Sequence, residues 1–371
     1  MNKLCLIFNI APHYRNNIYQ LIDKYYDCRW FFGENKTNVK GLDLSCLKNV
    51  TIGKNIKIFK KKAIYWQAGV FPFQKNQNAK TYLILGEPIC LSTWFLLIKL
   101  KTFHSAKYIY MWTHGWYGRE NRCKVFLKKV FFSMADGIFL YGNYAKELMI
   151  QQGFDANKLY VIYNSLDYDK QLKIKNSLRC SNIYTEHFGN SNHTLIFIGR
   201  LTKKKKLDLI IEALYMLNKQ LHRFNLIFVG DGEMMEQLKA LVFDKGLEQC
   251  VWFYGECYDE AVNARLLYSA DLCVSPGFVG LTAMHSLMFG TPVVTHNDFK
   301  NQAPEFEAVK EGETGAFFEM NSLKSLVETI SKWFNNECYN RNDIREKCYA
   351  EIDQKWTPKF QIKLFNEKLK F

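Results

Sequence analysis

Short runs of apolar and β-branched residues alternate with longer amphipathic segments along most of the chain. In the N-terminal half, the short runs predict five strands and the segments between them predict four helices. The predicted strands cover residues 4–10, 82–85, 108–112, 137–141 and 159–162, and the predicted helices cover 17–26, 88–101, 124–135 and 145–152. This alternation is typical of βαβ units in a parallel, doubly wound sheet.

The C-terminal half repeats the alternation more regularly. Strands are predicted over 194–198, 225–229, 251–254, 272–275 and 292–295, and helices over 207–220, 233–245, 259–269, 282–289 and 322–334. Residues 169–193 are polar and weakly patterned, so we expect the linker there. The tail over 358–371 predicts an amphipathic helix, because Ile362, Phe365 and Leu369 fall at helical spacing.

The length of 371 residues is too great for one ordinary core and suits two α/β domains. We expect one domain over 1–175, a second over 176–357 and a C-terminal helix over 358–371 that returns to the first domain. The 48% of hydrophobic residues can form a large core. The longest apolar run, 89–98, is about half the length of a membrane-spanning helix. The one short apolar stretch within the first thirty residues is interpreted as the first strand rather than as part of a signal peptide.

Eleven cysteines are scattered along the chain without a Cys-x-x-Cys pair, and their number is odd. We therefore expect buried thiols in a reducing cytosol, rather than disulfides or a zinc site. The net charge of +14 is unevenly distributed. Residues 1–180 hold 28 Lys/Arg and 11 Asp/Glu, whereas residues 181–371 hold 22 and 25. Nucleic acid, an anionic membrane or a polyanionic substrate could each explain a basic N-terminal half.

The turn over 277–281 carries the clearest sign of chemistry. A predicted strand ends at Ser275, and a helix is expected to begin near Thr282, a good N-cap residue. Gly277 and Gly280 let the backbone approach a ligand, and the first amides of the helix form an anion site. Two cations, Arg200 and Lys205, follow an earlier strand of the same half. One helix terminus and two cations suit a diphosphate.

The C-terminal half contains an ordered set of motifs that together are more specific than any one of them. The motifs are Phe197-Ile198-Gly199-Arg200-Leu201 with Lys205, Val229-Gly230-Asp231-Gly232, Phe253-Tyr254-Gly255, Ala270-Asp271-Leu272, Gly280-Leu281-Thr282-Ala283, Gly290-Thr291-Pro292-Val293-Val294, Pro304-Glu305 and Gly312-Glu313-Thr314-Gly315. Over roughly 120 residues the set resembles the retaining glycosyltransferases of family 4. The resemblance implies an α/β protein of the GT-B fold, with two Rossmann-like doubly wound domains facing a central cleft.

The resemblance also implies roles for individual residues. Arg200 and Lys205 would bind the diphosphate of a nucleotide-sugar donor and act in catalysis. The segment Phe278, Val279, Gly280, Leu281 and Thr282 would hold the distal phosphate and the sugar through its amides. The base would lie near Gly230, Glu256 and Cys257. No metal and no cofactor is expected, because the cations and the helix terminus neutralise the leaving group. The Asp-x-Asp at Asp167 and Asp169 is interpreted as a polar turn.

The sequence departs from the family at two positions. The family has two glutamates eight positions apart, the first on the sugar and the second on the ribose, and those positions here are Gly277 and His285. His285 is therefore a candidate for the ribose contact, and the alternative is a histidine that merely lies on a helix face.

Three candidates lie in the N-terminal half, where the resemblance is weaker. His13 and Arg15 follow the first strand, in a loop that helps to bind the sugar or the acceptor in the family. Arg15 is either a phosphate contact or a solvent-exposed arginine. His114 follows the strand over 108–112, where open α/β sheets place ligands, and is an active-site residue or a buried structural histidine. The segment 161–167 resembles the motif that ends the first domain in the family.

Basic and aromatic residues interleave over 57–66 and 122–132. Each segment alone could be a solvated helix face. Because the positive charge is concentrated in the expected acceptor half, we favour reversible binding to an anionic membrane. That location suits an acceptor sugar carried on a lipid diphosphate.

The sequence therefore predicts a metal-independent retaining glycosyltransferase of the hexosyltransferase type. It would move a sugar from a nucleotide-diphosphate donor to a hydroxyl of a lipid-linked glycan, in synthesis of a bacterial surface polysaccharide such as capsule or O-antigen. The expected location is the cytoplasm, peripheral on the inner face of the plasma membrane, with no nucleic-acid partner. Two alternatives stay open: an epimerase-like GT-B enzyme acting on a UDP-sugar, and a non-catalytic basic protein that binds nucleic acid.

Overall fold

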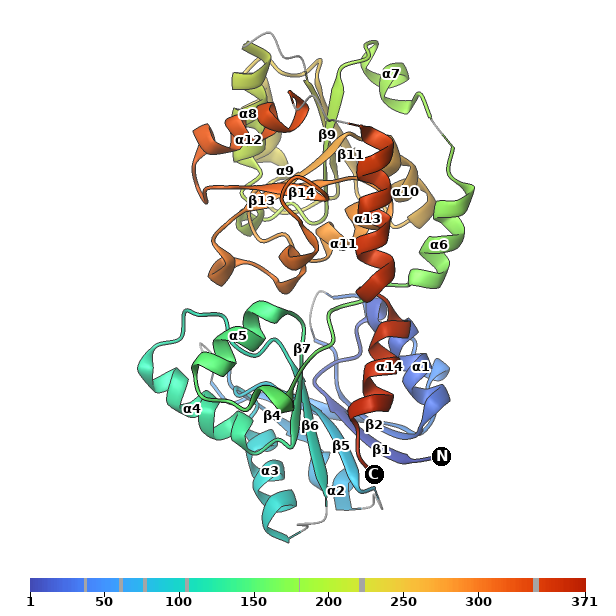
Figure 1. Cartoon of the computed structure of the whole chain (residues 1–371), viewed down its shortest axis with the longest axis vertical. Coiled ribbons are helices and arrows are strands. Elements are labelled where there is room, and N and C mark those ends of the chain that lie inside the picture. Colours follow the sequence, from blue (N-terminus) through green and yellow to red (C-terminus); the bar gives the residue numbers. More distant parts are fainter. Residues whose placement is uncertain are drawn as a thin grey trace. The chain divides into compact units, whose positions relative to one another are not determined.

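The computed structural model describes residues 1–36, 39–59, 63–75, 79–103, 107–179, 181–219, 224–335 and 340–371. These residues form two compact units (Figure 1). Unit 1 comprises Met1–Tyr168 and Thr357–Phe371, and unit 2 comprises Asp169–Trp356. Parts of the sequence predictions lie outside the described residues, namely Lys60, Lys61 and Lys62 of the basic segment 57–66, Gln220 of a predicted helix, and two cysteines, Cys180 and Cys338.

Unit 1 contains an eight-stranded sheet in the order β4-β3-β2-β1-β5-β6-β7-β8. Its strands are β1 (Lys3–Phe8), β2 (Asp27–Gly33), β3 (Val50–Lys57), β4 (Tyr65–Ala68), β5 (Thr81–Leu85), β6 (Tyr108–Thr113), β7 (Gly137–Leu140) and β8 (Leu159–Val161). All neighbouring pairs are parallel except β3 and β4. The helices are α1 (Asn16–Tyr25), α2 (Val70–Lys75), α3 (Leu91–Phe103), α4 (Arg122–Ser133), α5 (Asn143–Gln151) and α14 (Pro358–Lys368), with 3-10 turns η1 (His13–Arg15), η2 (Leu44–Cys46) and η3 (Ala156–Lys158).

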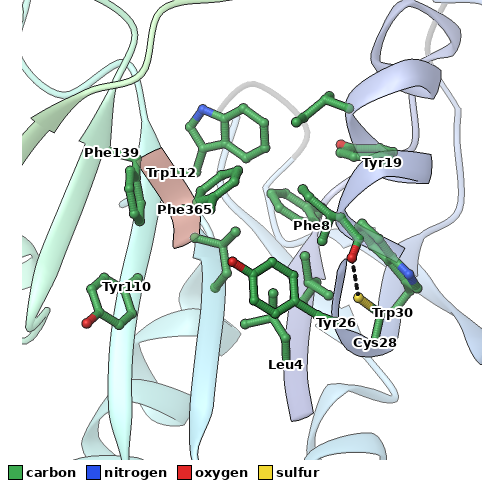
Figure 2. Packing of buried hydrophobic residues seen from close by; sticks show 14 of the residues in the cluster. Leu4, Phe8, Tyr19, Tyr26, Cys28, Trp30, Tyr110, Trp112, Phe139 and Phe365 are labelled. Carbon is green, nitrogen blue, oxygen red and sulfur yellow. Dashed lines mark hydrogen bonds between the residues drawn. The ribbon is translucent and has the colours of Figure 1, made fainter. Parts of the chain in front are cut away.

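The C-terminal helix α14 completes one of the two cores of unit 1. Its predicted stripe of Ile362, Phe365 and Leu369 is buried, which confirms the helical interpretation of the tail. The Phe365 ring meets Trp112 and Phe139 edge to face, at centroid distances of 5.4 Å and 4.7 Å (Figure 2). This core also contains side chains of α1, whereas the core on the other side of the sheet is built from α2, α3, α4 and α5.

Unit 2 contains a six-stranded, wholly parallel sheet in the order β11-β10-β9-β12-β13-β14. Its strands are β9 (His193–Ile198), β10 (Phe224–Val229), β11 (Val251–Gly255), β12 (Leu272–Ser275), β13 (Val293–His296) and β14 (Gly315–Phe318). Its helices are α6 (Tyr168–Ser177), α7 (Ile183–Phe188), α8 (Asp208–Lys219), α9 (Met235–Asp244), α10 (Glu260–Ser269), α11 (Leu281–Met288), α12 (Leu323–Phe334) and α13 (Arg341–Lys355), with 3-10 turns η4 (Lys203–Lys205), η5 (Phe299–Asn301) and η6 (Pro304–Ala308).

Residues 169–193, where we expected the linker, contain the helices α6 and α7, which were not predicted. The interpretation of Asp169 as part of a polar turn was wrong, because Asp169 lies in the first turn of α6. Helix α6 buries Gln171 in place of an apolar stripe, so periodicity could not reveal it. The sequence also gave no prediction for β2, β3, β4, β14, α2 and α13. Helix α13 is strongly charged and buries only the spaced residues Ile344, Cys348, Glu351 and Ile352.

Each sheet has one point at which the order of strands reverses. Strand β1 lies between β2 and β5, and strand β9 lies between β10 and β12. At such a point the connections leave in opposite directions, so a crevice opens beyond the carboxyl ends of the strands, where ligands bind. The fold thus places the loops after β1 and β5 together in unit 1, and the loops after β9 and β12 together in unit 2.

Replacing Phe365 with Ala tests the contribution of α14 to unit 1. We expect the unfolding free energy to fall by about 3–5 kcal/mol, because a fully buried aromatic ring would leave a cavity. Calorimetric unfolding measures the change. The exposed Phe243 of α9 provides the control, since F243A should change stability by less than about 0.5 kcal/mol. Equal stability of F365A and wild type would show that α14 is not part of the cooperative core.

Candidate functional site

The candidate residues of unit 2 come together at the carboxyl edge of its sheet. Arg200 and Lys205 follow β9, and Gly230 follows β10. Glu256 and Cys257 follow β11, and the turn from Gly277 to Gly280 follows β12. Because all these strands are parallel and adjacent, their loops meet at one edge.

Gly277 is required by a close approach between two backbones. A Cβ atom at this position would lie 2.1 Å from the Lys204 carbonyl oxygen and 2.8 Å from the Lys205 carbonyl carbon. The amide of Phe278 donates to the same Lys204 carbonyl at 3.2 Å. The η4 segment therefore occupies the space that any side chain at 277 would need. The departure from the family at this position has a structural cause, since η4 packs directly against the turn.

Lys205 fastens η4 to the turn through its side chain. Its Nζ donates to the carbonyl oxygen of Phe278 at 2.6 Å and to that of Val279 at 3.2 Å. Burial lowers the pKa of Lys205 to about 8, while the negative charge of the buried Glu305 in η6 acts in the opposite direction. At pH 7 the ammonium group is still mostly protonated, so Lys205 carries a partly desolvated positive charge.

Gln302 holds the other side of the turn, a role that no sequence pattern indicated. Its side chain is buried, and its Oε1 accepts a hydrogen bond from the Val279 amide at 3.0 Å. Its Nε2 donates to Thr295 Oγ1 at 2.8 Å and to the His296 carbonyl at 3.2 Å. The Val279 amide is thus already paired within the protein, and its role in binding the donor stays a prediction.

The start of α11 leaves amides open to a ligand. Gly280, with φ of 56°, is the N-cap residue, and the prediction of Thr282 as N-cap was wrong. Thr282 lies inside the helix, where its hydroxyl donates to the Ile198 carbonyl at 2.9 Å. Within the described parts of the chain, the amides of Leu281 and Thr282 donate to no protein acceptor. Two open amides at the positive end of a helix are suited to bind an anion.

The loops after β9 and β10 are packed backbone to backbone beside this anion site. A Cβ atom on Gly230 would lie 2.0 Å from the Gly199 carbonyl oxygen, and the Leu201 amide donates to the Asp231 carbonyl at 2.9 Å. Arg200 lies between these contacts, and its side chain is exposed. The loop geometry therefore holds the Arg200 backbone firmly while its guanidinium group can reach a ligand.

Glu256 and Cys257 begin the loop after β11. Glu256 is exposed and accepts a hydrogen bond from the Tyr258 hydroxyl at 2.5 Å. The Cys257 carbonyl accepts from the Asn263 side chain at 3.1 Å, which anchors the loop to α10. Both residues lie at the same sheet edge as Gly230, whose amide donates to the Gly255 carbonyl at 2.8 Å.

His285 belongs to a polar cluster that joins three helices. Its Nδ1 lies 3.5 Å from Glu260 Oε1, and the buried Gln171 of α6 donates to the same oxygen at 2.6 Å. Burial alone would raise the pKa of Glu260, but the hydrogen bond and charge of His285, together with Gln171, lower it to about 2. A carboxylate that sequence reasoning did not identify therefore lies beside His285.

In unit 1 the structure brings Arg15 and His114 together. The Arg15 guanidinium is buried, donates to the Tyr141 hydroxyl and lies over the Trp112 ring at 4.8 Å. The His114 ring lies 4.6 Å from the Tyr141 ring and keeps an exposed edge. Desolvation, followed by the charges of Arg15 and Lys128, lowers the pKa of His114 to about 4, so its imidazole is neutral at pH 7. The interpretation of Arg15 as solvent-exposed was wrong.

His13 and a missed carboxylate lie in the same unit. His13 is exposed, and its Nδ1 is 3.2 Å from the Lys40 carbonyl oxygen. Glu87, which follows β5, accepts hydrogen bonds from the Tyr65 hydroxyl at 2.5 Å and from the Asn9 side chain at 3.3 Å. Burial raises the pKa of Glu87, and these two hydrogen bonds oppose that effect. In the sequence, the only sign that Glu87 is a candidate site residue is its position after a predicted strand and before Pro88.

The described residues offer neither a disulfide nor a cluster of metal ligands. Their nine cysteines are free thiols, and they contain no group of three or more His, Cys, Asp or Glu arranged to hold a metal ion. None of the helices in the described ranges is long and apolar enough to cross a membrane.

Replacing Gly277 with Ala tests the close approach. The added methyl group would force η4 away from the turn, because the clashing atoms belong to the backbone. We expect both a loss of about 1–3 kcal/mol in stability and loss of function at this edge. Calorimetry measures the first effect, and a ligand-binding assay measures the second. Gly246 offers a matched control, since a Cβ atom there meets nothing within 4 Å, although its φ of 64° also disfavours alanine. If G277A is no less stable than G246A, the close approach is not a constraint.

Comparison with known proteins agrees with this geometry. Residues 183–351 match the family model of the glycosyl transferases group 1. A protein of Klebsiella pneumoniae described as "Uncharacterized 41.2 kDa protein in cps region" is 22% identical over 321 residues, covering 85% of this chain and 79% of the relative. The amylovoran biosynthesis glycosyltransferase AmsK of Erwinia amylovora is 28% identical over 191 residues, covering 51% of this chain and 41% of the relative.

Solved structures share the fold over the whole chain. The Alr3699/HepE protein of Anabaena in complex with UDP superposes with a TM-score of 0.72 at 16% identity, covering 99% of both chains. The lipopolysaccharide outer core galactosyltransferase WaaB superposes with a TM-score of 0.71 at 15% identity, covering 99% of this chain and 100% of that one. The predicted fold class is thus confirmed, and the chain is a glycosyltransferase with the GT-B fold whose residues 183–351 match the glycosyl transferases group 1.

Proposed function

We propose that this glycosyltransferase transfers a sugar from a UDP-sugar, with retention, to a hydroxyl of a lipid-linked glycan in the synthesis of a bacterial surface polysaccharide. Residues 176–357 would bind the donor, residues 1–175 would bind the acceptor, and the helix over 358–371 would complete the acceptor domain. The observation that carries the donor assignment is the juxtaposition of Lys205 with the open amides of Leu281 and Thr282. UDP is supported by the HepE structures in complex with UDP and with UDP-glucose.

The donor diphosphate would be neutralised by protein groups. The Lys205 ammonium group and the Arg200 guanidinium would face its oxygens, and the amides at the start of α11 would bind the distal phosphate. Gly280 and Phe278 would line the sugar, with Gly230, Glu256 and Cys257 near the base. This arrangement supplies positive charge where the leaving group develops negative charge, which is the chemical role that a divalent metal has in other transferases.

The transfer step would proceed on one face of the sugar. The bond between the anomeric carbon and the diphosphate oxygen breaks, the acceptor oxygen bonds to the same face, and the leaving oxygen takes the acceptor's proton. Lys205 and Arg200 would stabilise the departing diphosphate. On the acceptor side, the neutral His114 would accept or donate a hydrogen bond to the sugar, and Arg15 and His13 would contact the acceptor.

The setting follows from the relatives and from the charge. Relatives include a protein of a cps region and an amylovoran biosynthesis enzyme. We place the chain in the cytoplasm, as a peripheral protein on the inner face of the plasma membrane, where a lipid-linked acceptor is available. The non-catalytic nucleic-acid alternative is set aside, because the chain is a glycosyltransferase. No residue arrangement in the described chain favours epimerisation over transfer.

Replacing Lys205 with Ala is the decisive test of the donor site. We expect sugar transfer to fall by at least about 100-fold, because one charge–phosphate contact in a partly desolvated site is worth about 3–4 kcal/mol. Transfer of radiolabelled sugar from UDP-sugars to a membrane acceptor fraction measures it. Lys204, the exposed neighbour in η4, gives the matched control, and K204A should retain most activity. Wild-type turnover by a folded K205A variant would refute the donor assignment.

The His285 and Glu260 cluster would recognise the ribose. His285 lies one helical turn after Leu281, roughly 6 Å along the axis, so both residues lie on the same side of α11. A carboxylate is suited to accept hydrogen bonds from ribose hydroxyls. Glu260 would either bind these hydroxyls directly or hold His285 in place for the contact, and its low pKa keeps it ionised.

Deoxynucleotides test this assignment. We expect wild-type protein to bind UDP about 5–20-fold more tightly than 2′-deoxy-UDP or 3′-deoxy-UDP, and E260Q and H285A to lose at least part of that discrimination. Titration calorimetry measures the affinities. The exposed Glu248 supplies the control, because E248Q should discriminate like wild type. No binding of UDP or other nucleoside diphosphates to wild type would refute the donor proposal, whereas equal discrimination by E260Q, H285A and wild type would refute only the ribose contact.

A further inference from the structure

Exposed large apolar side chains are concentrated in one part of unit 1. Sixteen such side chains occur among the described residues, and ten of them lie between Ile52 and Val130. They are Ile52, Ile56, Ile58, Phe59, Ile89, Phe95, Ile98, Phe126, Leu127 and Val130. Unit 2, of similar size, exposes only Phe243, Tyr258 and Phe278 in its described residues. Large exposed apolar patches on a protein mark a binding surface, so this concentration indicates that this part of unit 1 binds a partner.

The exposed apolar side chains belong to neighbouring elements. Ile56 of β3 pairs with Trp66 of β4, and the Trp66 ring packs on Phe95 of α3 at 5.6 Å. Trp94 of α3 packs on Phe131 of α4 at 5.0 Å. Packed side chains therefore link β4, α3 and α4, and we call the outer side of these elements the α3–α4 face.

The hydrophobic core of unit 1 does not include the exposed apolar residues of the α3–α4 face. Helices α3 and α4 already bury Leu96, Leu97, Leu100, Phe131 and Phe132 against the sheet. Their exposed apolar residues lie on the opposite side of each helix, with Phe126 67% exposed and Phe95 57% exposed. The helices on the other face of the sheet differ, since α1 exposes only Tyr25 among its large apolar residues and α14 exposes none in its described length. Among the helices of unit 1, outward apolar residues are thus concentrated on α3 and α4.

Positive charge accompanies the apolar residues. Residues 52–130 contain fifteen lysines and arginines and only two acidic residues, Glu87 and Glu120. Glu87 is partly buried, and Glu120 is paired with Lys128 at 2.5 Å. The side chains of Lys124 and Lys129 on α4 are exposed beside Phe126 and Leu127. Residues 52–130, the segment that contains α3 and α4, therefore carry almost the whole net charge of the protein.

We propose that the α3–α4 face docks on a membrane that contains anionic lipid. Exposed aliphatic and aromatic side chains flanked by lysines are the combination that inserts between lipid headgroups, with the lysines bound to anionic headgroups. Nucleic acid would leave isoleucine, leucine and valine without apolar partners, and a second copy of this chain would bring two strongly positive surfaces together. This inference rests on the membrane location in the proposed function and adds the surface that makes the contact, and its test requires no turnover.

Vesicle co-sedimentation of the full chain tests the docking. At low ionic strength we expect binding to vesicles of phosphatidylglycerol and phosphatidylethanolamine, weaker binding as salt increases, and little binding to phosphatidylcholine vesicles. Variants localise the contact. F126S should lower the partition coefficient at least about fivefold, and K124Q and K129Q should each lower it about fivefold.

Matched residues of unit 2 serve as controls. Phe243 is as exposed as Phe126, at 72% against 67%, and the Lys324 side chain is 86% exposed. F243S and K324Q should bind vesicles within about twofold of wild type. UDP affinity and thermal stability of F126S, K124Q and K129Q should equal those of wild type, which shows that these variants are folded.

Three results would overturn the proposal. The first is absence of binding to anionic vesicles. The second is equal loss of binding in the unit 1 variants and in their unit 2 controls. The third is a concentration-dependent dimer in sedimentation equilibrium that F126S converts to a monomer, since a second copy would then cover the face.

Discussion

The candidate donor site depends on how one residue, Val279, is held from both sides. Its amide donates to Gln302 and its carbonyl accepts from Lys205, so two long side chains from different loops fix a single turn. Gln302 is tied in turn to β13 through Thr295 and His296. The turn, η4 and β13 therefore form one rigid assembly. Buried hydrogen bonds of this kind fix geometry because breaking any of them leaves a desolvated polar group.

Because the turn is fixed in place, the charged side chains of the candidate site come from the elements around it. With η4 pressed against Gly277, no side chain can project from that position. The acidic groups instead come from neighbouring elements: Glu305 of η6 moderates the charge of Lys205, and Glu260 of α10 lies beside His285. The absence of glutamates at the two family positions is therefore compatible with an intact site, in which carboxylates lie on other helices and turns.

Elements with a regular apolar pattern could be predicted from the sequence, whereas residues that act through distant contacts could not. Most helices and strands of unit 2 were predicted because apolar periodicity follows from burial in a sheet covered by helices. Helix α6 lacks such a stripe and that of α13 is narrow, with Ile344, Cys348 and Ile352 among charged residues, so both helices were missed. Gln302 and Glu260 act through contacts with residues distant in sequence, 23 positions away for Val279 and 89 for Gln171, and no local pattern encodes them. Thr282 resembled an N-cap, but its hydroxyl bonds to the Ile198 carbonyl of the adjacent strand instead.

Unit 1 differs from unit 2 in how its helices meet solvent. A helix that covers one face of a sheet needs only one apolar stripe, and α14 with its stripe of Ile362, Phe365 and Leu369 satisfies that requirement. Helices α3 and α4 carry a second, outward stripe that weakens solubility unless it is covered or surrounded by charge. Exposed lysines such as Lys124 and Lys129 supply that charge, and the large excess of basic over acidic residues in 52–130 also restricts the partner to an anionic one. The apolar stripe and the charge thus have a single explanation, because an anionic lipid surface satisfies both at once.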